Sequence, residues 1–168
     1  MPKGLKSTSS LITIGFEVTE SAANTFTQGQ IDLQLNPLDN EVFVVQAVNL
    51  DPSNPSAVAA TNTTVDAALT TTSRTAMPNL SDSAAIAVAA NAIVSDAVIG
   101  VGFSKMSMET PPSGLEYIGI IATNDFFVQV LGTNNTSAKK VSGKLYGYRA
   151  RADAAVYAAL VQSEVLSS

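Results

Sequence analysis

The sequence contains no cysteine, no histidine and no tryptophan among its 168 residues. Without cysteine, disulfide frameworks, cysteine-ligated zinc sites and thiol nucleophiles are excluded. Without histidine, no side chain titrates near neutral pH unless a carboxylate or a lysine is strongly perturbed, and most hydrolase, transferase and metalloenzyme mechanisms lose their usual base or ligand. We therefore expect a protein that is not an enzyme and that carries no cofactor and no metal.

Charged side chains are also scarce. They make up 14% of the chain, against about 25% in an ordinary soluble domain. A surface this poor in charge suits a protein that meets other proteins over much of its area. The net charge is −5, and the nine basic residues are dispersed, the nearest approach to a cluster lying between Lys139 and Arg151. Nucleic-acid binding needs clustered cations that neutralise phosphates, so direct nucleic-acid binding is not expected.

Long apolar runs are missing as well. The most apolar stretch, residues 84–103, is interrupted by Asn91, Ser95 and Asp96 and consists largely of small side chains. A membrane-spanning helix needs about 20 strongly apolar residues, so no transmembrane segment is predicted. The first ten residues, MPKGLKSTSS, lack the apolar core of a signal peptide.

The chain does contain alternating apolar and polar residues, the pattern of half-buried strands. Residues 41–50, EVFVVQAVNL, are instead apolar on both faces, which predicts a central strand or a strand covered by another subunit. Turn-forming segments such as NPLDN and PPSG separate the runs. Eight strands are predicted, over residues 9–20, 26–35, 41–50, 63–73, 97–108, 115–123, 126–133 and 140–150.

The fourth of these strands belongs to a segment with two open interpretations. Residues 57–80 are rich in Ala, Thr, Ser and Asn. The threonines and Val65 favour a strand over residues 63–73. The alternative is an exposed loop of about 20 residues, a length that is uncommon in a compact domain unless the loop is functional or held by a partner.

Two helices are predicted. The segment PNLSDS ends in residues that cap helices, and a narrow apolar stripe follows at three- and four-residue spacing, so we expect an inserted helix over about residues 82–95. Asp153 is a good N-cap for a second helix, over about residues 153–166 at the C-terminus. The members of the first stripe are Ile86, Ala89, Ala90 and Ile93.

These elements predict an all-β protein. Short strands joined by turns in a chain of this length indicate an antiparallel β-sandwich. Eight strands with a helix after the fourth favour an eight-stranded jelly roll. We expect residues 1–8 to form an N-terminal arm and residues 9–168 to form a single β-sandwich domain.

Chemistry-bearing groups are few. Carboxylates such as Asp32, Asp39, Glu41 and Asp51 lie at strand ends or in turns, where they are usually solvated rather than paired in a cleft. Neither GxxxxGK[ST] nor GxGxxG occurs, so a nucleotide loop is not predicted. Tyrosines and cations on the outward faces of the strands are the candidates for subunit contact or for a ligand surface. They are Lys105, Tyr117, Lys144, Tyr146, Tyr148 and Arg149.

Taken together, the strand order, the helix after the fourth strand, the low charge and the segment NDFFVQVLGTNNTSAKKVSGKLYGYRARAD resemble a viral capsid protein of the single jelly-roll type. The resemblance is architectural and spans the chain. It implies a virion protein that forms a large homo-oligomer, with other virion proteins as further partners. Many such proteins have a strongly basic N-terminal arm, whereas this chain has only Lys3 and Lys6 there, which argues against direct genome packaging.

Two classes of function follow. The first is a structural virion protein, of a capsid or coat, that self-assembles through extensive subunit contacts without catalysis. The second is a β-sandwich module that binds carbohydrate or a host surface. A filament or surface-layer subunit shares the assembly logic of the first class but forms open arrays. The expected location is the virion, or the cell surface or extracellular space for the alternatives.

Overall fold

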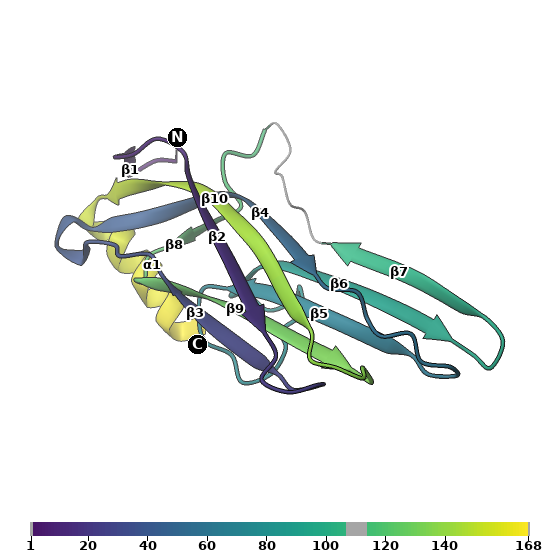
Figure 1. The fold of residues 1–168 in the computed structure, drawn as a ribbon. Helices are drawn as coiled ribbons and strands as arrows, with labels where there is room; N and C mark the ends of the chain where they lie inside the picture. Colours follow the sequence, from purple (N-terminus) through teal and green to yellow (C-terminus); the bar gives the residue numbers. More distant parts are fainter. Residues whose placement is uncertain (1, 107–113, 168) are drawn as a thin grey trace.

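The computed structural model describes residues 2–106 and 114–167, which form two antiparallel β-sheets packed face to face (Figure 1). The predicted all-β, antiparallel sandwich is confirmed. In the first sheet the order is β1-β10-β4-β8, and β2 pairs with β10 on the same side as β1. Its strands are β1 (Leu5–Ser7), β2 (Ile12–Thr19), β4 (Glu41–Pro52), β8 (Gly119–Ile121) and β10 (Lys140–Ala152).

The second sheet has the order β3-β9-β5-β6-β7. Strands β2, β10, β4 and β8 of one sheet and β3, β9, β5 and β6 of the other have the interleaved connectivity of a jelly roll. The predicted number of eight strands is wrong, because the described residues contain ten. The strands of the second sheet are β3 (Thr27–Asp32), β5 (Thr63–Thr70), β6 (Ala85–Ser95), β7 (Gly100–Met106) and β9 (Asp125–Thr133).

The prediction of a helix over about residues 82–95 is wrong, because residues 85–95 of this segment form strand β6. Alanine favours helices in isolation, but β5 offers a whole edge, and residues 85–93 pair with it from Thr70 to Thr63. In this conformation Ala87 and Ala89 face the core. The helix-start residue Asp82 is used in a turn instead, where its Oδ1 accepts from the backbone N–H of Ala84 at 2.9 Å.

The ambiguous segment 57–80 contains a strand, β5, which lies at the centre of the second sheet. The loop interpretation holds only for the residues on either side of it. The predicted strand 97–108 appears as β7, and its last two residues lie outside the described part of the chain. Within the expected N-terminal arm, residues 1–8, the short strand β1 pairs with the end of β10.

Strand β4 is central and buried on both faces, as its double apolar pattern predicts. Phe43 and Val45 face the core between the sheets, while Val42 and Val44 face outward. A register shift beside Gln46 reverses the alternation, so that Val48 also reaches the core. The main core contains an edge-to-face pair, Phe16 and Phe126, with ring centroids 5.9 Å apart.

The predicted C-terminal helix is confirmed as α1 (Ala154–Ser167). Asp153 caps it, accepting from the backbone N–H of Val156 at 2.8 Å. The helix covers the outer face of the first sheet, where Leu160 packs over Val42 and Val44. A short 3₁₀ helix, η1 (Pro37–Asp39), precedes β4. Helix α1 lies at one end of the sandwich and the hairpin of β6 and β7 extends from the other (Figure 1).

Candidate interaction surface

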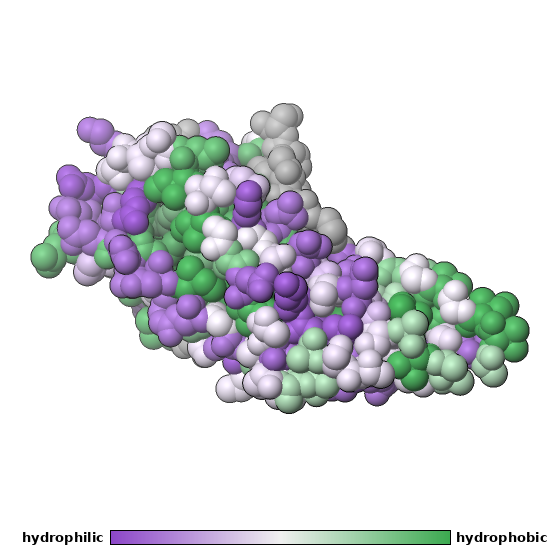
Figure 2. Space-filling model, viewed as in Figure 1, coloured by the Kyte–Doolittle hydropathy of each residue, from purple (hydrophilic) through white to green (hydrophobic). Residues whose placement is uncertain are grey.

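The β6–β7 hairpin projects beyond the sandwich. Strand β6 pairs with β5 only as far as Ile93, and β7 pairs with β6 alone. We call residues 94–105 the arm. Phe103 is 52% exposed and Val98 is 89% exposed. Figure 2 shows hydrophobic residues gathered at the far end of this arm. Large exposed apolar side chains on the arm are Val94, Val98, Ile99, Val101 and Phe103.

The two faces of the arm differ. Residues directly opposite each other in an antiparallel pair project to the same face. Val94 pairs with Val101, and Ala92 pairs with Phe103, so these side chains share the outer face of the second sheet. On the opposite face, Gly102 has no side chain beside its partner Ile93. The outer face of the arm is therefore a continuous apolar stripe.

A groove lies at the base of the arm, on the same outer face. Its volume is about 540 Å³. One wall comes from the loop between β5 and β6, and the floor comes from β6 and its neighbours. The apolar residues of its lining are Ala67, Met77, Pro78, Leu80, Val88, Ala89 and Ala90.

Two charged residues, Asp66 and Lys105, also line this groove. Both are paired with Ala90, from the strands on either side of it, so the three form one row across β5, β6 and β7. Burial raises the pKa of Asp66, while a hydrogen bond from Thr64 and the positive charge of Lys105 oppose that shift. The groove is thus apolar with a complementary charge pair across its floor.

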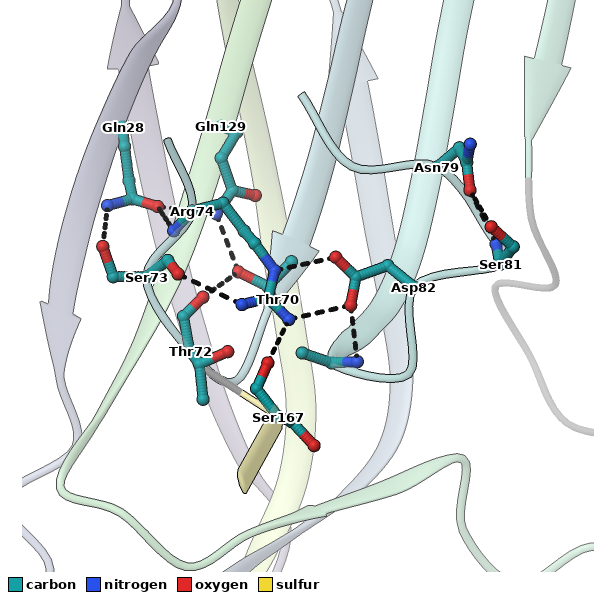
Figure 3. A network of polar contacts seen from close by, with 11 residues as sticks. Gln28, Thr70, Thr72, Ser73, Arg74, Asn79, Ser81, Asp82, Gln129 and Ser167 are labelled. Carbon is teal, nitrogen blue, oxygen red and sulfur yellow. Dashed lines mark hydrogen bonds and ion pairs between the residues drawn. The ribbon is translucent and has the colours of Figure 1, made fainter. Parts of the chain in front are cut away.

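A polar cluster fastens the loop that forms the groove wall (Figure 3). The Arg74 guanidinium contacts both carboxylate oxygens of Asp82, at 2.7 and 2.8 Å, and donates to the Ser167 carbonyl oxygen at 2.7 Å. Gln28 accepts from the backbone N–H of Arg74 and from the Gln129 side chain. The ion pair holds the pKa of Asp82 below its ordinary value. Loop 71–84 is therefore attached to both β3 and the C-terminal residues.

Five of the six predicted surface residues lie on the first sheet or next to it, and Lys105 lies apart from them on the second. Lys144 and Tyr146 line one shallow hollow of about 280 Å³. Tyr148 lines a separate hollow of about 360 Å³. Tyr117 and Tyr148 pack against the apolar cluster under α1. Burial, and then the negative charge of Glu116, raise the pKa of Tyr148.

Arg149, the sixth predicted residue, is engaged within the chain. Its Nη2 donates to the Leu33 carbonyl oxygen at 2.8 Å, and its Nη1 donates to the Gln34 carbonyl oxygen at 3.0 Å. Nη1 also lies 3.1 Å from Glu41 Oε2. These bonds attach the segment after β3 and the start of β4 to Arg149 on β10, so the guanidinium stabilises the fold.

Asp32, Asp39 and Glu41, three of the carboxylates singled out in the sequence, are likewise used in intrachain contacts. Asp39 pairs with Arg151 at 3.1 Å, and Asp32 accepts from the backbone N–H of Gln34. Within residues 2–106 and 114–167, no three acidic side chains converge as metal ligands would. Asp51 lines the hollow with Lys144.

Two buried carboxylates escaped the sequence analysis. Glu20 accepts from the backbone N–H groups of Thr25, Gly132 and Lys139, at 2.8 to 3.0 Å. Glu164 on α1 accepts from Ala122 and Thr123. Burial raises the pKa of Glu164, against the effect of these hydrogen bonds. Both carboxylates organise turns, and a lone acid in an ordinary polar context carries no sequence signal for this.

The exposure of the arm was also not apparent from the sequence, where alternation in residues 97–108 indicates an ordinary strand. The one local signal is the alternation of Gly100 and Gly102 with the large apolar residues Ile99, Val101 and Phe103. Comparison with protein-family models and with curated proteins gave no match. In the part of the chain that the structure describes, no helix has the length and hydropathy needed to cross a bilayer.

Proposed function

We propose that this chain is a non-catalytic structural subunit that self-assembles through contacts between its copies, as in the capsid or coat of a virion. The observation that carries this proposal is the projecting arm with its exposed apolar stripe. Apolar surface exposed contiguously on a soluble protein marks an interaction site. Strand β7 is the edge of the second sheet and carries a single charge, Lys105, at its sheet-proximal end, and a largely apolar edge invites pairing or coverage by another chain.

Three further properties of the chain support self-assembly rather than catalysis. Charged residues are only 14% of the chain, which leaves much of the surface ready for protein contacts. The strand order is that of a jelly roll, the architecture of the capsid proteins that the sequence resembles. Of the ten described residues that line the groove, Asp66 and Lys105 alone are titratable, and their charges offset each other.

Negative-stain microscopy of the purified chain, over a range of salt and pH, tests the proposal. We expect closed shells or other regular assemblies of uniform subunit spacing. Particles of monomer size under every condition, at high protein concentration, would contradict it. Open filaments would support self-assembly, but they would indicate a filament or surface-layer subunit instead of a capsid or coat protein.

A second candidate is a module that binds carbohydrate, favoured by the hollow where Tyr146 and Lys144 lie beside Asn49 and Asp51. An aromatic face next to amide and carboxylate oxygens is suited to a sugar ring and its hydroxyl groups. Glycan-array binding by the wild type that is lost in Tyr146→Ala would support this function. A glycan array on which the wild type gives no signal would contradict this carbohydrate-binding function.

A further inference from the structure

We infer that the tip of the arm of one copy seats in the groove of a second copy. This inference rests on the proposed function and identifies the two surfaces that meet. The arm cannot reach its own groove, because β6 runs as one continuous strand from the groove floor at Ala90 into the arm at Val94. An arm that seats in this groove therefore belongs to a different copy of the chain.

The two surfaces complement each other in size. At the base, the small residue Ala90 lies on the floor of the groove, between Asp66 and Lys105 on the neighbouring strands. At the tip, Val98 and Ile99 stand 89% and 63% exposed. Protein interfaces pack to the density of protein interiors only when large side chains meet hollows. A projecting apolar tip and an apolar groove on one molecule form such a pair, since each copy supplies both.

The tip also carries one charge that a residue of the groove can pair. Asp96 is the one charged residue between Ser83 and Ser104, and it lies in the turn at the tip. Its Oδ1 accepts from the backbone N–H groups of Val98 and Ile99, both at 2.7 Å. These bonds fix the turn and lower the pKa of Asp96. A tip seated in the groove, with its carboxylate on the Lys105 side and away from Asp66, pairs that carboxylate with the Lys105 cation.

The contact has a geometric consequence. If two arms cross about a twofold axis, each tip enters the other copy's groove and the contact closes at a dimer. If the copies are related by another rotation, each arm engages the next copy and the contact continues around a ring or along an array. In both cases every contact joins residue 99 of one copy to the groove wall of another.

Cross-linking between engineered cysteines tests this contact, because the chain has no cysteine of its own. Ile99→Cys at the tip is mixed with Leu80→Cys on the groove wall, each in a full-length chain with tags of different mass. Both side chains are more than 60% exposed, so neither substitution disturbs the core. Leu38→Cys, at a 93% exposed position in η1, is the matched control.

After mild oxidation we expect a disulfide-linked heterodimer of Ile99→Cys with Leu80→Cys, formed at least tenfold faster than that of Ile99→Cys with Leu38→Cys. Adding Ala90→Phe to the Leu80→Cys chain fills the groove, and the cross-linking rate then falls to that of the control. Light scattering on each variant before oxidation reports its assembly state.

Equal rates for the Leu80 and Leu38 partners, in chains that still assemble, would overturn the arm-in-groove contact while leaving self-assembly intact. Fast homodimer formation by Ile99→Cys alone, with slow coupling to Leu80→Cys, would show a tip-to-tip contact and overturn it as well. Chains that remain monomeric throughout would contradict both this contact and the proposed function.

Discussion

At Gly147, strand β10 passes close to β4, and a side chain has no room. A Cβ atom built there would lie 2.5 Å from Phe43 Cε1 and even closer to the Val44 carbonyl oxygen. We expect Gly147→Ala to lower the free energy of unfolding by about 1–3 kcal/mol, since overpacking forces backbone shifts. Urea denaturation measures the loss.

The matched control is Gly15→Ala, in the strand on the other side of β10. A Cβ atom at Gly15 meets nothing within 4 Å. Its effect on the free energy of unfolding should stay within about 0.5 kcal/mol. Similar losses for both variants would contradict the close approach at Gly147 and point instead to a general effect of alanine in these strands.

The carboxylate of Glu164 is a second residue with a specific expected effect. It is 7% exposed and accepts from the backbone N–H groups of Ala122 and Thr123, at 2.6 and 3.0 Å. Glu164→Ala leaves both N–H groups without their acceptor and should cost about 1–3 kcal/mol of unfolding free energy. Glu164→Gln keeps one acceptor oxygen and removes the buried charge, so we expect a smaller loss.

The pH dependence of Glu164 has a definite sign. Burial raises its pKa in the folded chain, so the folded state binds a proton more readily than the unfolded state does. The stability of the wild type relative to Glu164→Gln should therefore rise as pH falls from the raised pKa to the ordinary pKa of a glutamate. Urea midpoints of both proteins across this window measure it. A relative stability that falls on acidification would contradict the buried, desolvated carboxylate.

Among the elements, loop 71–84 depends on one ion pair. Arg74 and Asp82 are 2.7 Å apart, with side chains 16% and 23% exposed. We expect Arg74→Ala to reduce the free energy of unfolding by about 1–3 kcal/mol, because charged hydrogen bonds to a half-buried carboxylate are lost. Since Arg74 lowers the pKa of Asp82, this stabilisation should be lost as pH falls through that lowered pKa.

Lys140→Ala, which removes an exposed ion pair on strand β10, is the control for Arg74→Ala. Lys140 and Glu17 lie 3.4 Å apart, with both side chains more than half exposed. Exposed pairs contribute about 0–1 kcal/mol, so the variant should be nearly neutral in urea denaturation. If Arg74→Ala were equally neutral in chemical denaturation, the cluster around Asp82 would not be what fastens the loop.

Some of the helices and strands could be predicted from the sequence and others could not. Strand β2 was predictable because its alternation is strict, and α1 because Asp153 stands before a run that suits a helix. Strand β6 was not predictable because its apolar residues are mostly alanine, which fits either period and favours a helix locally. Its conformation is decided by the free edge of β5, a contact between residues far apart in the chain. The reversal of alternation in β4 beside Gln46 has the same origin.

The two ends of the molecule differ (Figure 1). At one end helix α1 covers the outer face of the first sheet, and at the other end the arm extends from the second sheet. Of the six predicted surface residues, Lys105 alone belongs to the arm, where it lines the groove. Alternation within residues 97–108 was visible in the sequence. Whether an alternating strand faces a core or solvent depends on what packs over it, and the sequence does not encode that locally.

The central claim is that copies of this chain associate through the arm. Light scattering after size-exclusion chromatography, on the wild type, on Phe103→Asp and on Leu38→Asp, tests it most directly. Phe103 and Leu38 are both exposed, so each variant should fold with the stability of the wild type. We predict a multimeric mass for the wild type and for Leu38→Asp, and a monomeric mass of about 17.4 kDa for Phe103→Asp. A monomeric wild type, or a Phe103→Asp variant that assembles as the wild type does, would contradict the claim.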